Sequence, residues 1–84
     1  MKAVRAETKE KQIKVLEILE LEGYSWCLGQ KPTDYVPYER NGPESHYIKI
    51  DEDKKILKTA TKIYPGQEEI SYQQFISKNK KVIL

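Results

Sequence analysis

The sequence predicts a small α+β domain with an N-terminal helix, an antiparallel sheet of about three strands, a long loop after strand 1, and a short C-terminal helix. Three patterns predict this fold class. Residues 7–22 are rich in helix formers, residues 46–63 contain a strand-like alternation, and residues 30–45 hold three prolines without a sustained period. Because the chain has 84 residues, we expect one domain, residues 1–84, around one core.

The N-terminal helix has the clearest signal. Glu7 and Lys11 stand at the favourable i,i+4 spacing, and Gly23 supplies the residue that readily adopts a positive φ at a helix end. At 100° per residue its apolar side chains span an arc of roughly 220°, wider than the stripe of an ordinary surface helix. We therefore expect the helix to pack on two sides, the second being either the long loop or a second copy of the chain.

Two further patterns predict the sheet. Tyr24, Trp26 and Leu28 alternate with other residues and are followed by Gly29, which predicts a first strand over residues 24–28 with these three side chains on one face. Residues 46–50 and 56–63, joined by the acidic turn at residues 51–54, predict an antiparallel hairpin.

The C-terminal part begins with a helix-start signal. Ser71 and Gln74 have the spacing of a capping box, with Ile70 and Phe75 at the positions of a hydrophobic staple, so a second helix is expected from Tyr72. The helix should fade near residue 79. The apolar residues 82–84 are then a candidate edge strand.

Composition restricts location and chemistry. The 15 basic and 13 acidic residues leave a net charge of +2 and are interleaved, which is typical of a solvated surface. A single cysteine cannot form an internal disulfide, and no apolar run approaches the ~20 residues that span a bilayer. The N-terminus lacks the apolar stretch of a signal peptide. We expect a cytoplasmic protein without a membrane partner.

The residues give no support for catalysis. Cys27 and His46 are the single cysteine and the single histidine, and no spacing motif joins them to each other or to metal-ligating carboxylates. The four glycines are scattered, so no phosphate-binding loop or dinucleotide fingerprint occurs. We therefore expect no enzyme activity, no catalytic residues, no metal and no cofactor.

The long loop is the most suggestive segment for binding, because it gathers tyrosine, arginine and histidine around three prolines. Tyrosine and arginine are enriched at interface anchors, and prolines order the backbone in advance. The candidate binding residues are Lys31, Tyr35, Tyr38, Arg40, His46 and Tyr47. The alternative is that Tyr35 and Tyr38 cover the open face of the sheet while Arg40 pairs with a neighbouring glutamate.

A string of the form GYxWxxGxxPT runs from Gly23 to Thr33, preceded by a charged helix and followed by a hairpin and a YxxF helix start at Tyr72 to Phe75. This arrangement resembles small proteins of bacteriophage and prophage accessory regions. The resemblance covers most of the chain and carries no catalytic residues. It implies a phage-encoded protein acting in the bacterial host cell, one that blocks a host defence by binding a protein or a nucleotide signal.

Three hypotheses about function follow. The first is a non-enzymatic accessory protein that binds a host or phage protein through the loop. The second is a nucleotide or nucleic-acid sink, in which Lys31, Arg40 and His46 hold phosphate while Tyr35 or Trp26 stacks on a base. A basic hairpin strand fits this reading, although a net charge of +2 is low for it. The third is a homodimerisation module built on the wide apolar arc of the first helix.

Overall fold

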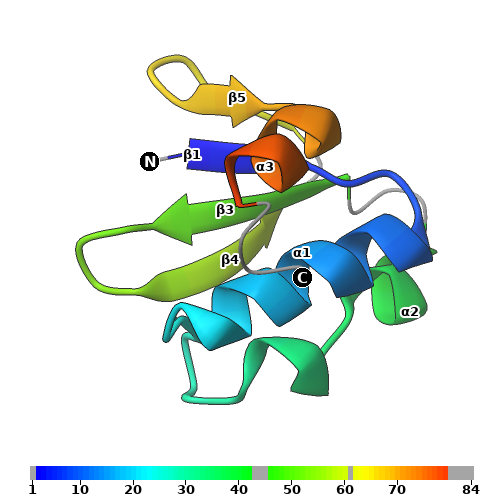
Figure 1. Ribbon diagram of the computed structural model, residues 1–84, viewed down its shortest axis with the longest axis vertical. Coiled ribbons are helices and arrows are strands. Elements are labelled where there is room, and N and C mark those ends of the chain that lie inside the picture. The colour runs from blue at the N-terminus through cyan, green and yellow to red at the C-terminus, as the bar shows by residue number, and fades with distance from the viewer. Residues whose placement is uncertain (1, 43–45, 61, 80–84) are drawn as a thin grey trace.

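The computed structural model describes residues 2–42, 46–60 and 62–79. In chain order its elements are β1 (Lys2–Arg5), α1 (Lys9–Leu21), β2 (Ser25–Trp26), the 3-10 helix η1 (Pro32–Asp34), α2 (Pro37–Asn41), β3 (Tyr47–Asp51), β4 (Ile56–Ala60), β5 (Glu68–Ile70) and α3 (Tyr72–Lys78). The strands form one sheet in the order β2-β4-β3-β1-β5, and α1 and α3 lie on one of its faces (Figure 1). The α+β class is confirmed.

The sheet differs from the prediction in size and in type. It has five strands and is mixed, because β1 pairs antiparallel with β3 but parallel with β5, and β2 pairs parallel with β4. The prediction of about three antiparallel strands is therefore wrong. Strand β1 was missed because a four-residue segment with a single β-branched residue, Val4, is too short to show an alternation. Strand β5 was missed because two of its three residues are glutamates.

Helix α1 is built as its sequence predicts. The side chain of Thr8 caps its first turn by accepting a hydrogen bond from the backbone N–H of Lys11 at 3.2 Å, and Gly23 follows its end with φ +89°. Its apolar side chains pack on the sheet and also contact η1 and α2. The second side of the helix is thus covered by the loop of the same chain, which accounts for the wide apolar arc without a second copy.

One hydrophobic core lies between the helices and the sheet. Its strand residues include Val4, Ile48, Ile50 and Leu57, all of which are buried. Because successive strand residues point to opposite faces, Tyr47 and Lys49 on β3 and Lys58 on β4 belong to the other face. The residues of the central strands therefore divide into a set that faces the core and a set on the opposite face of the sheet.

Residues 30–42, the described part of the predicted loop, are more regular than predicted. Pro32 and Pro37 each stand in the first turn of a helix, where the missing N–H of proline is not needed, and they begin η1 and α2. The prediction of an irregular loop is therefore wrong for these segments. The first strand is shorter than predicted, since β2 ends at Trp26 and Leu28 is exposed rather than packed in the core.

The hairpin and the second helix are confirmed. Strands β3 and β4 pair antiparallel, and α3 starts at Tyr72 with both hydrogen bonds of the Ser71–Gln74 capping box in place. Ile70 and Phe75 are both buried in the core. The apolar tail at residues 82–84 lies outside the described residues. Within the described ranges, no helix is long and apolar enough to span a membrane.

Candidate functional site: a groove at the β4 edge

A groove of about 740 Å³ lies where the short strand β2 leaves the sheet. One wall is formed by Trp26, Leu28 and β4 residues, and the other by the segment from η1 to α2, including Tyr35 and Arg40. The segment predicted to be a long loop therefore folds back to form a wall beside the sheet edge. Three tethers hold that wall in place.

The first tether is Trp26. Its indole Nε1–H donates a hydrogen bond to the carbonyl oxygen of Pro32 at 3.0 Å, and its ring lies against Tyr35 with the centroids 5.2 Å apart and the planes at 42°. Trp26 itself is buried, as its position in the predicted strand suggested. It therefore joins β2 to the opposite wall and sets the position of Tyr35.

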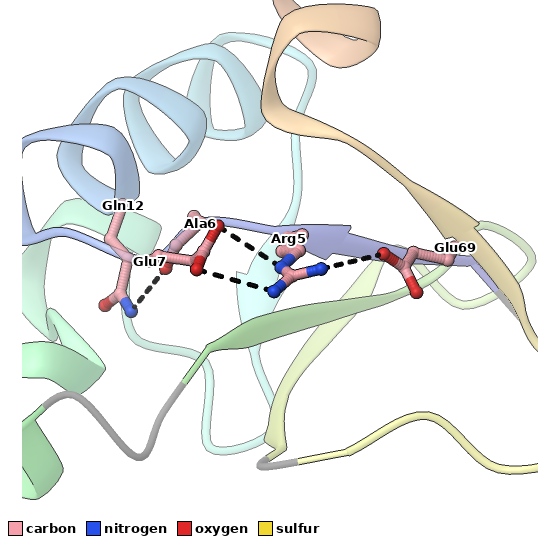
Figure 2. Close-up of polar contacts among 5 residues, drawn as sticks. All are labelled: Arg5, Ala6, Glu7, Gln12 and Glu69. Atoms are coloured by element: carbon pink, nitrogen blue, oxygen red, sulfur yellow. Dashed lines mark hydrogen bonds and ion pairs between the residues drawn. The ribbon is translucent and has the colours of Figure 1, made fainter.

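The second tether is Gln12, a fully buried polar residue on α1. Its side-chain Nε2 donates to the carbonyl oxygen of Ala6 at 3.1 Å (Figure 2), and its Oε1 accepts from the backbone N–H of Tyr38 at 2.9 Å. The N–H of Tyr38 belongs to the first turn of α2, where no intrahelical acceptor exists. One amide side chain thus connects the β1–α1 junction to the helix that carries Arg40.

The third tether joins α1 to η1. Both the backbone N–H and the hydroxyl of Thr33 donate to Oε1 of Glu20, at 3.2 and 2.5 Å. The hydroxyl bond, followed by the backbone bond, lowers the pKa of the Glu20 carboxyl below its ordinary value, since both stabilise the charged form. This contact is solvent-exposed, so it orients η1 more than it stabilises the fold.

Among the described residues, no strand pairs with the groove side of β4 beyond Leu57. Strand β2 pairs with β4 at Ile56 and Leu57, and the N–H of Ser25 donates to the carbonyl oxygen of Lys55 at 3.1 Å. Main-chain groups of alternate residues point to the same side of a strand, so the N–H and C=O of Thr59 also face outward. In the described part of the chain, no strand lies beside Thr59 on that side.

The charged side chains that line the groove differ in whether an ion pair engages them. Glu39 is engaged by Lys9, with Nζ and Oε1 3.8 Å apart. Arg40 and Lys58 also line the groove, and no ion pair engages either of them within the described residues. Asp34 is the remaining acidic residue of the lining. The groove therefore offers two cations beside apolar and aromatic surface.

The structure divides the predicted binding residues between different places. Tyr35 and Arg40 line the groove, Tyr38 stands half-buried in the first turn of α2, and Lys31 is exposed just before η1. His46 and Tyr47 lie at the start of β3, outside the groove lining, with their rings edge-to-face at 6.4 Å. The phosphate site imagined from Lys31, Arg40 and His46 is therefore not assembled around this groove.

His46 has two contrasting polar groups. Its carbonyl oxygen accepts from the N–H of Ala6 at 2.7 Å, which joins the start of β3 to the end of β1. Its ring Nδ1 is buried without a hydrogen-bond partner among the described residues. The backbone of His46 thus links the start of β3 to the end of β1.

Several groove residues were missed by sequence reasoning. Leu28 was expected on the strand face of Tyr24 and Trp26, but it is 84% exposed at the groove rim. The available signal was Gly29, which adopts φ +88° and turns the chain away from β4 one residue later. Thr33 ends the GYxWxxGxxPT string and Lys58 belongs to the basic hairpin strand, but neither was selected as a candidate binding residue.

The described residues contain no group of three or more His, Cys, Asp or Glu side chains arranged to hold a metal ion. Cys27 lies on the groove rim and is exposed. Comparison with known proteins found no matching family model, no similar curated protein and no similar solved structure.

Proposed function

We propose that this protein is a protein-binding module that takes an extended segment of a partner protein into the groove beside β4. The observation that carries the proposal is the outer edge of β4 at Thr59, which no strand of the described residues pairs with and which lines the same groove as the exposed side chain of Leu28. Extended peptides commonly bind by adding a strand to such an edge, with backbone hydrogen bonds giving affinity and side-chain pockets giving specificity.

The groove supplies both kinds of contact. The outward N–H and C=O of Thr59 offer one donor and one acceptor to an added strand. The Trp26–Tyr35 pair and Leu28 offer apolar surface to the side chains of that strand. Because Trp26, Gln12 and Glu20 hold the wall in advance, little ordering entropy is lost on binding.

The charges indicate the chemistry of the bound segment. Arg40 and Lys58 have no carboxylate partner within the described residues, whereas Glu39 is already paired with Lys9. An acidic residue in the partner beside an apolar one would complement this arrangement. We therefore propose a segment that is extended, apolar at one position and acidic at a nearby one.

The resemblance to phage accessory proteins extends the proposal to the identity of the partner. It favours a host protein, including a component of a host defence system, over a second copy of this chain as the partner. Binding would inhibit the defence system if the segment bound in the groove is one that the host component needs for its own assembly.

A peptide screen tests the proposal directly. The full chain would be screened against a displayed library of random peptides of about a dozen residues at physiological salt, and the selected peptides measured by fluorescence anisotropy. We expect a shared apolar–acidic pattern and a loss of affinity of at least about tenfold for Tyr35→Ala and for Arg40→Ala, because interface anchors of these types contribute most.

Two variants outside the groove serve as controls. Tyr64→Ala removes an exposed tyrosine and Lys14→Ala an exposed cation, and neither residue lines the groove. Both should bind the selected peptides as the wild type does. A screen that yields no peptide, or peptides that bind Tyr35→Ala and Arg40→Ala unchanged, would overturn the proposal.

A further inference from the structure

The face of the sheet opposite α1 carries Arg5, Lys49 and Lys58, with Asp51 and Glu69 as the carboxylates of the same face in the described strands. The β3–β4 register places Lys49 directly opposite Lys58, and both belong to this face. Like charges directly opposite one another destabilise a strand pair. The two opposed lysines therefore lower the free energy of unfolding unless another contact offsets their repulsion.

A third lysine joins this pair through a tyrosine ring. Nζ of Lys49 lies 4.3 Å from the centroid of the Tyr64 ring, and Nζ of Lys62 lies 5.3 Å from the same centroid. Lys49 is only 6% exposed as a residue, so its aliphatic stem is packed into this face. A cation–π contact offsets part of the cost of burying a charge but does not neutralise it.

The carboxylates of this face have other partners, since Asp51 Oδ1 accepts from the backbone N–H of Lys54 at 3.3 Å and Glu69 faces Arg5. Arg5, on the same face, lies between Glu7 and Glu69, with Arg5 Nε 3.2 Å from Glu7 Oε1 and Nη1 3.7 Å from Glu69 Oε2 (Figure 2). The lysine cluster of this face consists of Lys49, Lys58 and Lys62. None of the ion pairs among the described residues involves these three lysines.

The aromatic ring is held in place and remains accessible. Tyr64 begins a turn in which Gln67 N–H donates to the carbonyl oxygen of Tyr64 at 3.1 Å and Tyr64 N–H donates to Gln67 Oε1 at 3.0 Å. Pro65 and Gly66, the latter at φ +89°, supply the turn chemistry between them. The Tyr64 side chain is 52% exposed, so the part of its surface that the lysines leave uncovered faces solvent.

We propose that this lysine–tyrosine face binds nucleotide, with one phosphate group against each of Lys49, Lys58 and Lys62 and a base stacked on Tyr64. Ammonium groups around an exposed aromatic ring on an open sheet face are the elements that bind single-stranded nucleic acid. The inference is independent of the peptide groove, although Lys58 borders both surfaces. A free nucleotide and a single strand share this chemistry.

The test uses the full chain with two probes, a labelled single-stranded oligonucleotide of mixed sequence and ATP as competitor, followed by fluorescence anisotropy. Three phosphate contacts to a single strand predict a slope of about −2 for log K against log salt, so raising NaCl from about 50 to 200 mM should weaken binding about sixteenfold. Competition by ATP at the affinity of the oligonucleotide identifies a single-nucleotide ligand, and a much tighter oligonucleotide identifies a strand. Either result supports the site.

Matched variants separate this site from a general charge effect. Lys62→Gln should weaken oligonucleotide binding several-fold and reduce the salt slope by about 0.7, whereas Lys14→Gln, the same change on the far side of α1, should leave both unchanged. Tyr64→Leu should weaken binding at least about fivefold and Tyr64→Phe by less than about twofold, because stacking needs the ring and not the hydroxyl.

Lys49 distinguishes a binding site from a structural lysine. Lys49→Met removes the opposed charge, so the thermal midpoint should stay or rise while oligonucleotide affinity falls. A lower midpoint with unchanged affinity would contradict the proposal. So would the absence of binding to either probe at about 50 mM salt, or equal losses in Lys14→Gln and Lys62→Gln.

Discussion

The two edges of the sheet are protected in different ways. At one edge, β5 is only three residues long and exposes Glu68 and Glu69, and the chain enters α3 directly after it. Short length and charge are the usual devices that keep an edge strand from pairing with another chain. At the other edge, β2 covers β4 for two residues and then leaves it, and the groove there combines apolar side chains such as Leu28 with the charged side chains of Arg40 and Lys58.

This difference shows how binding surface arises in so small a fold. Both edges belong to one sheet over one core, but only the β4 edge is accompanied by a wall that the chain holds in place through Trp26, Gln12 and Glu20. A chain that needed only to avoid aggregation would give both edges the protection that β5 has. Substitutions in the two buried tethers, Trp26 and Gln12, should have larger effects than changes at the rim or in the exposed Glu20–Thr33 contact.

The largest effect is expected for Trp26→Ala. The change removes a buried indole and its hydrogen bond to Pro32, and core truncations of this size cost about 3–5 kcal/mol in free energy of unfolding. Trp26→Phe keeps most of the packing but leaves the Pro32 carbonyl without its donor, so about 1–3 kcal/mol is expected. Chemical denaturation of the three proteins measures both, and equal stabilities would show that Trp26 does not hold the wall.

The next effect is expected for Gln12→Ala. The substitution leaves the buried carbonyl of Ala6 and the N–H of Tyr38 without this partner, which costs about 1–3 kcal/mol. It should also loosen α2, so the backbone amide signals of α2 in an NMR spectrum should shift more than those of α3. Gln73→Ala, an exposed glutamine on α3, should change stability by less than about 0.5 kcal/mol.

The rim is tested with two exposed leucines. Leu28 is 84% and Leu21 is 72% exposed, and only Leu28 lines the groove. Both Leu28→Ser and Leu21→Ser should change stability by less than about 0.5 kcal/mol. Peptide affinity should fall about tenfold in Leu28→Ser alone, because an anchor loss of about 1.4 kcal/mol corresponds to that factor. Equal affinities of the two variants would remove Leu28 from the binding surface.

The smallest effect concerns pH. Because Thr33 lowers the folded-state pKa of Glu20, the stability from this contact is fully present above the ordinary carboxyl pKa of 4.5 and is lost as pH falls through the lowered value. The thermal midpoint of the wild type should therefore exceed that of Thr33→Val at neutral pH. The difference should shrink in acid. A difference that persists unchanged at about pH 2 would show that Glu20 charge plays no part.

The sequence predicts the elements that have long or specific local signals. Helix α1, the β3–β4 hairpin and the Ser71–Gln74 capping box were all identified from spacing and cap residues. Strands β1 and β5 are too short to show a period, and their pairing joins segments that are more than 60 residues apart in the chain. Nothing local to Lys2–Arg5 indicates that it becomes a central strand.

The candidate sites were predicted only in part. Tyr35 and Arg40 were selected for their residue types, and the structure places both in the groove. Leu28 was placed on the strand face of the buried Trp26 because alternation takes no account of the turn at Gly29. The opposition of Lys49 and Lys58 depends on strand register, which the alternation of each strand alone does not determine.

The central claim is that the β4 edge, and not the β5 edge, accepts a strand from a partner. Hydrogen exchange of individual backbone amides, measured by NMR with and without a peptide selected in the screen, tests it most directly. The account predicts that the Thr59 amide exchanges more slowly when the peptide is bound, whereas the amides of Glu68 and Glu69 are unchanged. A peptide that binds without slowing Thr59, or that protects the β5 edge instead, would contradict it.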